Sequence, residues 1–304
     1  MPQLRLAITV VLLSACVQPT PTTSIAPTAG QRSSIPAVPS PLASMPTPRT
    51  HLAKAVIEGA VFAIGGLGRG GTRLATVERF DLISRSWKQA IDLPLPLDHA
   101  MAGAVEGEVI VVGGVYAQGS SRGFRLDSAG GPWREISPMP VARAAGAATV
   151  LDGLLYVVGG VGSDTHHDGS TRVFTYDPTA DRWSETAPMS TPRQHLAVVT
   201  YQGRVCAVGG RGPGASSGEC YDPSADRWER LPDLAAPEED FDAVVVEGKI
   251  WTFGPHGVQV FDGARWRLVR EIASPGFGGV AVASGRTVYL LGWSDGGVFQ
   301  VQLP

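Results

Sequence analysis

The chain has 304 residues and a formal net charge of −3 at pH 7, with 25 basic and 28 acidic side chains. Because no basic stripe runs along it, we do not expect a nucleic-acid partner. A hydrophobic fraction of 43% provides enough apolar surface for a substantial core, and excludes a largely disordered chain.

The first fifteen residues have the layout of a signal peptide. Arg5 precedes an apolar run over residues 6–13, which is too short to anchor the chain as a membrane span. Leu13-Ser14-Ala15-Cys16 resembles a bacterial lipoprotein signal, in which cleavage precedes the cysteine and the cysteine is lipidated. The alternative is an ordinary secretory signal followed by an unrelated cysteine.

The lipoprotein resemblance implies export and attachment to the bacterial cell envelope through acyl chains on Cys16. Residues 16–33 are rich in Pro, Thr and Ser and are expected to form an extended tether. Val17 is not the aspartate that favours inner-membrane retention in enterobacterial lipoproteins. The resemblance therefore implies an outer-membrane location if the source is Gram-negative.

Residues 34–304 are predicted to form one domain built from a repeat. A Gly-Gly pair begins at positions 65, 113, 159 and 209, and a tryptophan follows each pair. Before each pair, two short apolar runs flank a turn that contains a glycine, which predicts a β-hairpin. After each pair come a variable loop, a third strand, and a fourth strand opened by the tryptophan. These tryptophans are Trp87, Trp133, Trp183 and Trp228, with Trp266 in a degraded fifth unit.

These units resemble the kelch motif, and the whole resembles a kelch-type β-propeller. The fold class implied is all-β, with six blades of four antiparallel strands. The fifth unit has Gly254-Pro255 in place of Gly-Gly, and the sixth has Leu291-Gly292. Since the sixth unit ends without a fourth strand, we expect residues 35–44 to supply that strand and close the ring. The prolines within residues 35–44 are tolerated because this strand would be the exposed edge of its sheet. We expect a monomer.

Two cysteines fall in the second and third strands of the fourth unit. Cys206 and Cys220 are expected on neighbouring strands, so an oxidising compartment would allow a disulfide between them. Two buried free thiols are the alternative, and the sequence does not decide between these readings.

In kelch-type propellers the loops that lead into the first strands gather around the channel mouth, so the resemblance implies a candidate ligand-binding rim there. When the repeats are aligned, one shared position holds Arg49, Leu97, Arg143, Arg193, Glu238 and Pro275, and a second, two residues later, holds His51, His99, Ala145, His195, Asp240 and Phe277. Arginines and acids gathered on one rim would suit a carboxylate or a sugar. The alternative is that these side chains bond the backbone of their own loops.

No metal or cofactor is predicted from these residues. Metal ligands must lie about 2 Å from one ion, and we expect histidines on separate blades to be too dispersed for that. A second histidine pair, His166-His167, lies in a polar loop where solvated side chains are the simpler reading.

The function favoured by the sequence is non-catalytic. A kelch-type propeller on the envelope would bind a protein or glycan partner through the loops around the channel mouth, an analogy that rests on the fold. The alternative is a carbohydrate-active enzyme resembling N-acetylneuraminate epimerase, in which Arg143, Arg193 and Glu238 would hold and protonate a sugar acid. No nucleophile or metal-binding motif of a known enzyme class stands out.

Overall fold

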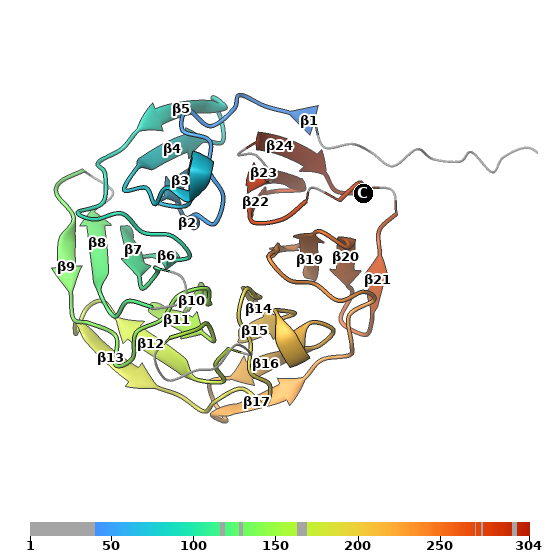
Figure 1. The fold of residues 1–304 in the computed structure, drawn as a ribbon. Coiled ribbons are helices and arrows are strands. Elements are labelled where there is room, and N and C mark those ends of the chain that lie inside the picture. The colour runs from blue at the N-terminus through green and yellow to red at the C-terminus, as the bar shows by residue number, and fades with distance from the viewer. Residues whose placement is uncertain are drawn as a thin grey trace, which may run out of the picture. The chain divides into compact units, whose positions relative to one another are not determined.

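The computed structural model describes residues 40–115, 119–127, 130–162, 169–270, 272–274, 276–293 and 297–304. These belong to one unit, Ile35–Pro304, which is separate from Met1–Ser34. The predicted signal peptide, Cys16 and the tether lie outside the described residues, as does the His166-His167 pair. Within the described part of the unit, six four-stranded antiparallel sheets are arranged around an axis (Figure 1).

The first three sheets follow the chain in order, and each runs from an innermost to an outermost strand. Blade one contains β2 (Ala53–Ile57), β3 (Ala60–Ile64), β4 (Val77–Asp81) and β5 (Ser86–Gln89). Blade two contains β6 (Met101–Val105), β7 (Glu108–Val112), β8 (Gly123–Asp127) and β9 (Arg134–Ile136). Blade three contains β10 (Ala147–Leu151), β11 (Leu154–Val158), β12 (Val173–Asp177) and β13 (Arg182–Glu185).

The remaining sheets repeat this plan, and the last one includes a strand from the other end of the chain. Blade four contains β14 (Ala197–Tyr201), β15 (Arg204–Val208), β16 (Gly218–Asp222) and β17 (Arg227–Arg230). Blade five contains β18 (Asp242–Val246), β19 (Lys249–Gly254), β20 (Gly257–Phe261) and β21 (Trp266–Leu268). Blade six contains β22 (Val280–Ser284), β23 (Thr287–Trp293), β24 (Gly297–Gln302) and β1 (Ser40–Pro41).

Ring closure occurs through β1, as the sequence predicts. Ser40 pairs with Gln300 and Pro41 with Phe299, and the Leu42 amide donates to the Val298 carbonyl at 2.9 Å. The ribbon shows β1 lying along β24 at the ring's edge (Figure 1). The N-terminal part of the predicted strand, residues 35–39, lies outside the described residues. Because both ends of the unit share one sheet, opening the ring requires breaking this β1–β24 pairing.

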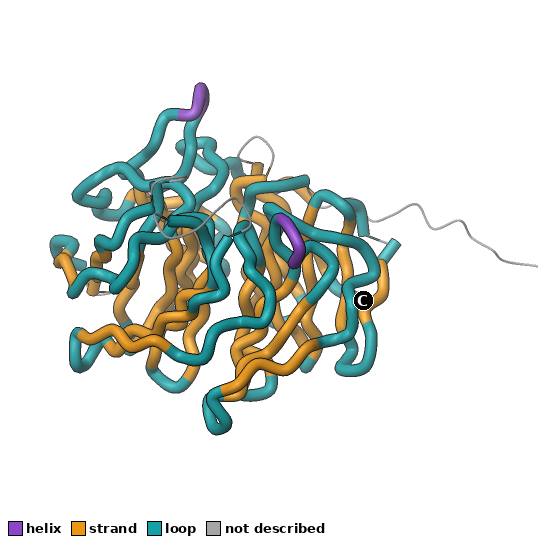
Figure 2. Tube along the Cα trace, turned by 60° about the horizontal axis from the view of Figure 1, so that its bottom comes forward, coloured by secondary structure: helices purple, strands orange, loops and turns teal. Residues whose placement is uncertain are grey.

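The core lies between blades rather than inside one sheet. Six apolar clusters of buried side chains each draw on two neighbouring blades, so every blade interface has its own cluster. Loops and turns occupy the two ends of the strands (Figure 2). The helices among the described residues are two one-turn 3-10 segments, η1 (Arg69–Gly71) and η2 (Gly212–Gly214). In that part of the chain, no helix has the length and hydrophobicity needed to cross a membrane.

Four of the five repeated tryptophans link their blade to the chain that enters from the blade before it, whereas Trp266 Nε1 has no hydrogen-bond partner among the described residues. The indole nitrogens of Trp133, Trp183 and Trp228 each donate to a linker carbonyl at 2.8 Å, and Trp87 does so at 3.1 Å. The acceptors are the carbonyls of Ile91, Ser137, Ala187 and Ala43, in the same order. These four tryptophans therefore have a structural role, because each joins its blade to the preceding linker by a hydrogen bond.

The first glycine of each Gly-Gly pair is required by close backbone contact. Gly113 has φ +70, and a Cβ built there would lie 2.4 Å from the Arg143 carbonyl oxygen. That oxygen also accepts a hydrogen bond from the Gly114 amide at 2.8 Å, so it cannot easily withdraw. Gly203, in a hairpin turn, has φ +71 but no atom within 4 Å of the place that a Cβ would take.

This contrast gives a first prediction. Gly203→Ala should cost about 1–2 kcal/mol of unfolding free energy, because only the left-handed backbone is strained. Gly113→Ala should cost about 2 kcal/mol more, because the methyl group also overlaps a fixed carbonyl. Urea unfolding of both variants measures the difference, and equal losses would mean that backbone contact does not explain the Gly-Gly pair.

Candidate functional site at the channel mouth

A closed ring of six backbone hydrogen bonds surrounds the channel mouth. Each blade contributes one residue, two positions before its innermost strand, and each amide donates to the carbonyl of the next member. The bonds are His51 to Gly278 (2.8 Å), Gly278 to Asp240 (2.8 Å), Asp240 to His195 (3.1 Å), His195 to Ala145 (2.7 Å), Ala145 to His99 (2.9 Å) and His99 to His51 (3.1 Å). The amides and carbonyls of all six residues are thus paired with one another, so the mouth has a fixed backbone frame.

All six members of this ring have left-handed backbone conformations, with φ between 50° and 75°. His and Asp tolerate this region better than most side chains, and glycine adopts it freely. The alignment that predicted the second shared position is confirmed for the first five blades. In blade six the position belongs to Gly278, and the expected Phe277 was wrong by one residue. The expected Pro275 at the first shared position lies outside the described residues.

Inside the ring lies a cavity of about 130 Å³ that all six blades line. Four of the eight predicted rim residues line it, namely His51, His99, His195 and Asp240. The imidazole centroids of His51 and His99 are 4.2 Å apart, and those of His99 and His195 are 5.2 Å apart. The structure therefore gathers residues from four different blades at one point on the axis.

The other four predicted rim residues, Arg49, Arg143, Arg193 and Glu238, do not line the cavity. Their side chains are buried beneath the loops, and at most 2% of each residue is exposed. Arg193 shows the role: its guanidinium donates to the carbonyls of Gly209, Gly214 and Ser217 at 2.7–2.9 Å and pairs with Glu219 at 3.2 Å. For Arg193 the alternative raised by the sequence is therefore correct: its side chain bonds the backbone of a loop.

Glu238 replaces an arginine at this position in blade five. Its carboxylate occupies the space beside Gly254, 2.2 Å from where a Cβ would stand, and it accepts from the Gln259 amide group at 3.3 Å. Burial raises the pKa of Glu238 to about 7. Because residue 254 is a glycine, there is room for the Glu238 carboxylate beside it, and the carboxylate does not line the channel cavity.

Two of the three histidines at the mouth have a lowered pKa. Burial, reinforced by His99, lowers the pKa of His51 to about 4. Burial also lowers the pKa of His195 to about 2, with further contributions from the Arg211 cation and the neighbouring histidines. The charged groups at the mouth include Arg211, whose Nη2 pairs with the Asp240 carboxylate, and the Lys54–Asp242 ion pair.

Sequence comparison assigns the repeat. A family model described as Kelch motif matches residues 48–93, 142–190 and 192–235, which correspond to blades one, three and four. Three of the six blades therefore match the Kelch motif. Among solved structures, "Structure of YjhT" is similar to this chain, with a TM-score of 0.73 at 16% sequence identity. The match covers 85% of this chain and 95% of that one, which supports the fold alone. No curated protein matches the sequence significantly.

Three charged residues of the channel mouth were not predicted from the sequence. Arg211 directly follows the fourth Gly-Gly pair, and Lys54 and Asp242 interrupt the apolar runs of innermost strands β2 and β18. Lys54 Nζ pairs with the Asp242 carboxylate and donates to the Ala281 carbonyl at 2.7 Å. A charged side chain within an innermost strand was the readable signal, because only the channel offers that strand a polar neighbour.

The dispersal expected for histidines on separate blades is contradicted by the structure. His51, His99 and His195 each place one ring nitrogen within 4.8 Å of the other two. Equivalent positions on neighbouring blades converge here because the hydrogen-bonded ring is narrow. The expectation that no metal is bound remains a prediction.

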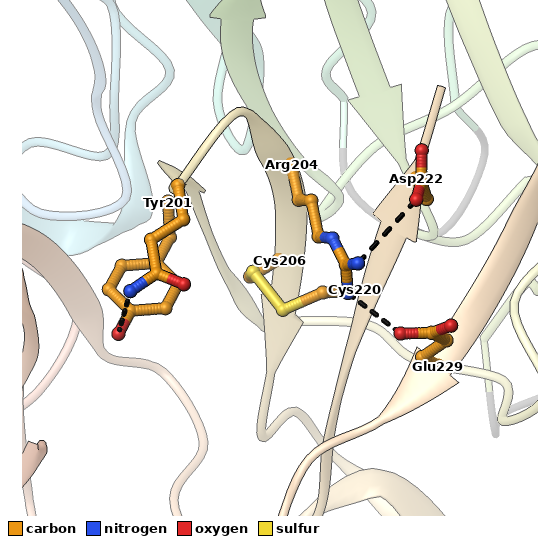
Figure 3. The surroundings of a disulfide bond; sticks show 7 residues. Tyr201, Arg204, Cys206, Cys220, Asp222 and Glu229 are labelled. Carbon is orange, nitrogen blue, oxygen red and sulfur yellow. Dashed lines mark hydrogen bonds and ion pairs between the residues drawn. A yellow bond between two sulfur atoms is a disulfide. The ribbon is translucent and has the colours of Figure 1, made fainter. Parts of the chain in front are cut away.

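Blade four also contains a disulfide, well inside its sheet. Cys206 on β15 and Cys220 on β16 are direct cross-strand partners and are joined through their sulfurs (Figure 3). Both cysteines are buried, and Arg204 bridges Glu229 at 2.7 Å and Asp222 at 3.5 Å on the strands beside them (Figure 3). Of the two readings left open by the sequence, the structure has the disulfide.

Proposed function

We propose that this Kelch propeller is an exported recognition protein of the bacterial cell envelope, anchored through lipid on Cys16, that binds a protein or glycan partner at its channel mouth. The observation that carries the proposal is the cavity on the axis. It brings three imidazoles, the Asp240 carboxylate and the Lys54–Asp242 pair together on a fixed backbone frame. A concave site with a few convergent polar groups on rigid elements is typical of a binding site.

Two features support export. The first is the resemblance of residues 13–16 to a lipoprotein signal. The second is the Cys206–Cys220 disulfide, since such bonds persist mainly in oxidising compartments. Residues 16–33 would then act as a tether between the lipid and the propeller, and Val17 favours an outer-membrane address in a Gram-negative cell.

The non-catalytic role is preferred over the sugar-acid epimerase because of where the arginines lie. That alternative needs Arg143 and Arg193 as a clamp and Glu238 as an acid or base. Arg193 is committed to three backbone carbonyls and Glu219, and Arg143 donates to Ser170 Oγ at 3.1 Å and to the Ala142 carbonyl at 3.2 Å. An enclosed volume of about 130 Å³ is also below the 300 Å³ or more of typical small-molecule pockets.

Ligand-dependent thermal unfolding tests the binding site. The parent, Arg211→Met at the mouth and Glu58→Gln at a hairpin turn on the opposite end of the strands are screened against sugars, sugar acids and short polar peptides. A ligand at 100 times its Kd should stabilise the parent and Glu58→Gln by about 2.7 kcal/mol. Arg211→Met should lose most of this shift, measured against its own ligand-free midpoint. A ligand that stabilises all three proteins equally binds elsewhere and contradicts the proposal.

A further inference from the structure

The three histidines of the mouth have an arrangement that goes beyond a generic polar cavity. They stand at one structural position in blades one, two and four, and their left-handed backbones direct them to the axis. The ring centroids are 4.2, 5.2 and 6.4 Å apart, and one nitrogen of each lies within 4.8 Å of the other two.

A second set of contacts orients these imidazoles. Each Nδ1 contacts the side-chain oxygen of the residue immediately before it. These oxygens are Thr50 Oγ1 at 3.0 Å, Asp98 Oδ2 at 2.9 Å and Gln194 Oε1 at 2.8 Å. A carboxylate or amide oxygen only accepts, so Nδ1 of His99 and His195 carries the proton and Nε2 carries a lone pair. Histidines that bind metals are oriented in this way by a second hydrogen bond.

Asp98, which orients His99, is itself held in place. Its Oδ1 accepts from Arg73 Nε at 2.8 Å, and only 3% of the residue is exposed. The orientation of His99 is therefore supported by two successive charged contacts.

A buried carboxylate oxygen faces the same point. Asp240 Oδ1 has no hydrogen-bond partner among the described residues, and it lies 3.4 Å from His195 Nε2 and 3.9 Å from His51 Nε2. The contact of His195 Nδ1 with Gln194 Oε1 holds the proton on Nδ1, so Nε2 presents its lone pair on the side of this carboxylate oxygen. An unpaired buried acceptor is costly, and a shared cation would satisfy the carboxylate oxygen.

From this geometry we propose that His51, His99 and His195, with Asp240, form a binding site for one divalent transition-metal ion of the Zn²⁺ class. Three imidazole nitrogens and one carboxylate oxygen are a donor set that Zn²⁺ accepts in tetrahedral sites. Zn–N distances near 2.0–2.1 Å place neighbouring nitrogens about 3.3 Å apart, so binding draws the rings inward by modest rotations. The site goes beyond the proposed recognition function and does not depend on any partner.

The experiment is a titration of the metal-stripped full chain with Zn²⁺ by calorimetry and with Co²⁺ by visible absorption. We expect one ion per chain at this site and Co²⁺ bands of the intensity given by four-coordinate ions. His99→Ala and His195→Ala should abolish both signals. Alanine is compatible with the backbone there, because Ala145 occupies the same position in blade three with φ 53.

Two further variants separate a built site from adventitious binding. Asp98→Ala removes no ligand but releases Nδ1 of His99, and should weaken Zn²⁺ binding about 10–100-fold. The second is a triple variant, His166→Ala/His167→Ala/His256→Ala. It removes every histidine outside the proposed site and should leave the Zn²⁺ affinity unchanged. Circular dichroism confirms that each variant is folded. No binding by the parent, or binding that survives His99→Ala or disappears in the triple variant, would overturn the proposal.

Discussion

Arg193→Met should lower the free energy of unfolding by about 3–5 kcal/mol, the range for breaking a buried charge pair. The guanidinium is 1% exposed, pairs with Glu219, and donates to three loop carbonyls. Removing it leaves a buried carboxylate without its cation and takes one hydrogen bond from each of the three carbonyls, of which those of Gly214 and Ser217 keep a backbone donor. The loop from Gly209 to Ser217 should lose its support as well.

Urea unfolding at neutral pH measures this loss, and two comparisons identify its cause. Arg230→Met removes an exposed arginine whose ion pair with Asp233 lies in solvent, so the midpoint should hardly move. Replacing Glu219 by Leu in the Arg193→Met background should recover part of the stability, because no unpaired charge then remains. A loss for Arg193→Met no larger than that for Arg230→Met would refute the structural role of this arginine.

Reduction of the Cys206–Cys220 disulfide should lower the free energy of unfolding by about 3 kcal/mol. The bond joins residues 14 apart in sequence, and in the chain-entropy model a loop of about 15 residues restricts the unfolded chain by that amount. Blade four supplies one wall of the channel mouth through β14 and His195, so its loosening should also weaken ligand and metal binding.

The measurement compares thermal unfolding with and without a phosphine reductant. The control is the Cys206→Ala/Cys220→Ala double variant, whose midpoint should be lower than that of the oxidised parent and insensitive to the reductant. An unchanged midpoint for the parent on reduction, with free thiols confirmed by mass spectrometry, would show that the cross-link adds no stability.

Much of the fold could be predicted because the same short sequence signals recur in each repeat. Glycines at hairpin turns, Gly-Gly at the end of the second strand and tryptophan on the fourth strand are all local signals, and the structure confirms the strands they predicted. The closing strand was also predictable. The sixth unit of the sequence has only three strands, and residues near Ser40 can supply the fourth. In blade six the register was wrong by one residue, because no Gly-Gly pair fixes its alignment.

The site was only half predictable, for a geometric reason. Arg49 and His51 are two residues apart, as are Arg193 and His195, yet a left-handed residue at the second position turns the chain between them. The histidine then faces the axis, while the arginine lies beneath the Gly-Gly turn of its own blade. Sequence spacing gives the shared position but not this direction, so Arg49, Arg143, Arg193 and Glu238 were placed on the rim.

The convergence of the histidines was beyond the sequence for a related reason. Their separation depends on the radius of the ring, which follows from six backbone hydrogen bonds; five join residues about 40–50 positions apart, and the sixth joins His51 to Gly278. Arg211, Lys54 and Asp242 were visible as charges in unexpected places, but their partners lie on other blades.

Site-specific photo-cross-linking on intact cells can show whether the partner binds at the channel mouth. Phe277 is 50% exposed beside Asp240, and Ile83 is 90% exposed in the turn between β4 and β5, at the opposite end of the strands. A photoreactive benzoyl-phenylalanine is introduced at one position or the other in the full chain. We expect a discrete adduct from position 277 that is absent from position 83 and lost in an Arg211→Met background. An adduct from position 83 alone, or one from position 277 that Arg211→Met leaves intact, would contradict binding at the channel mouth.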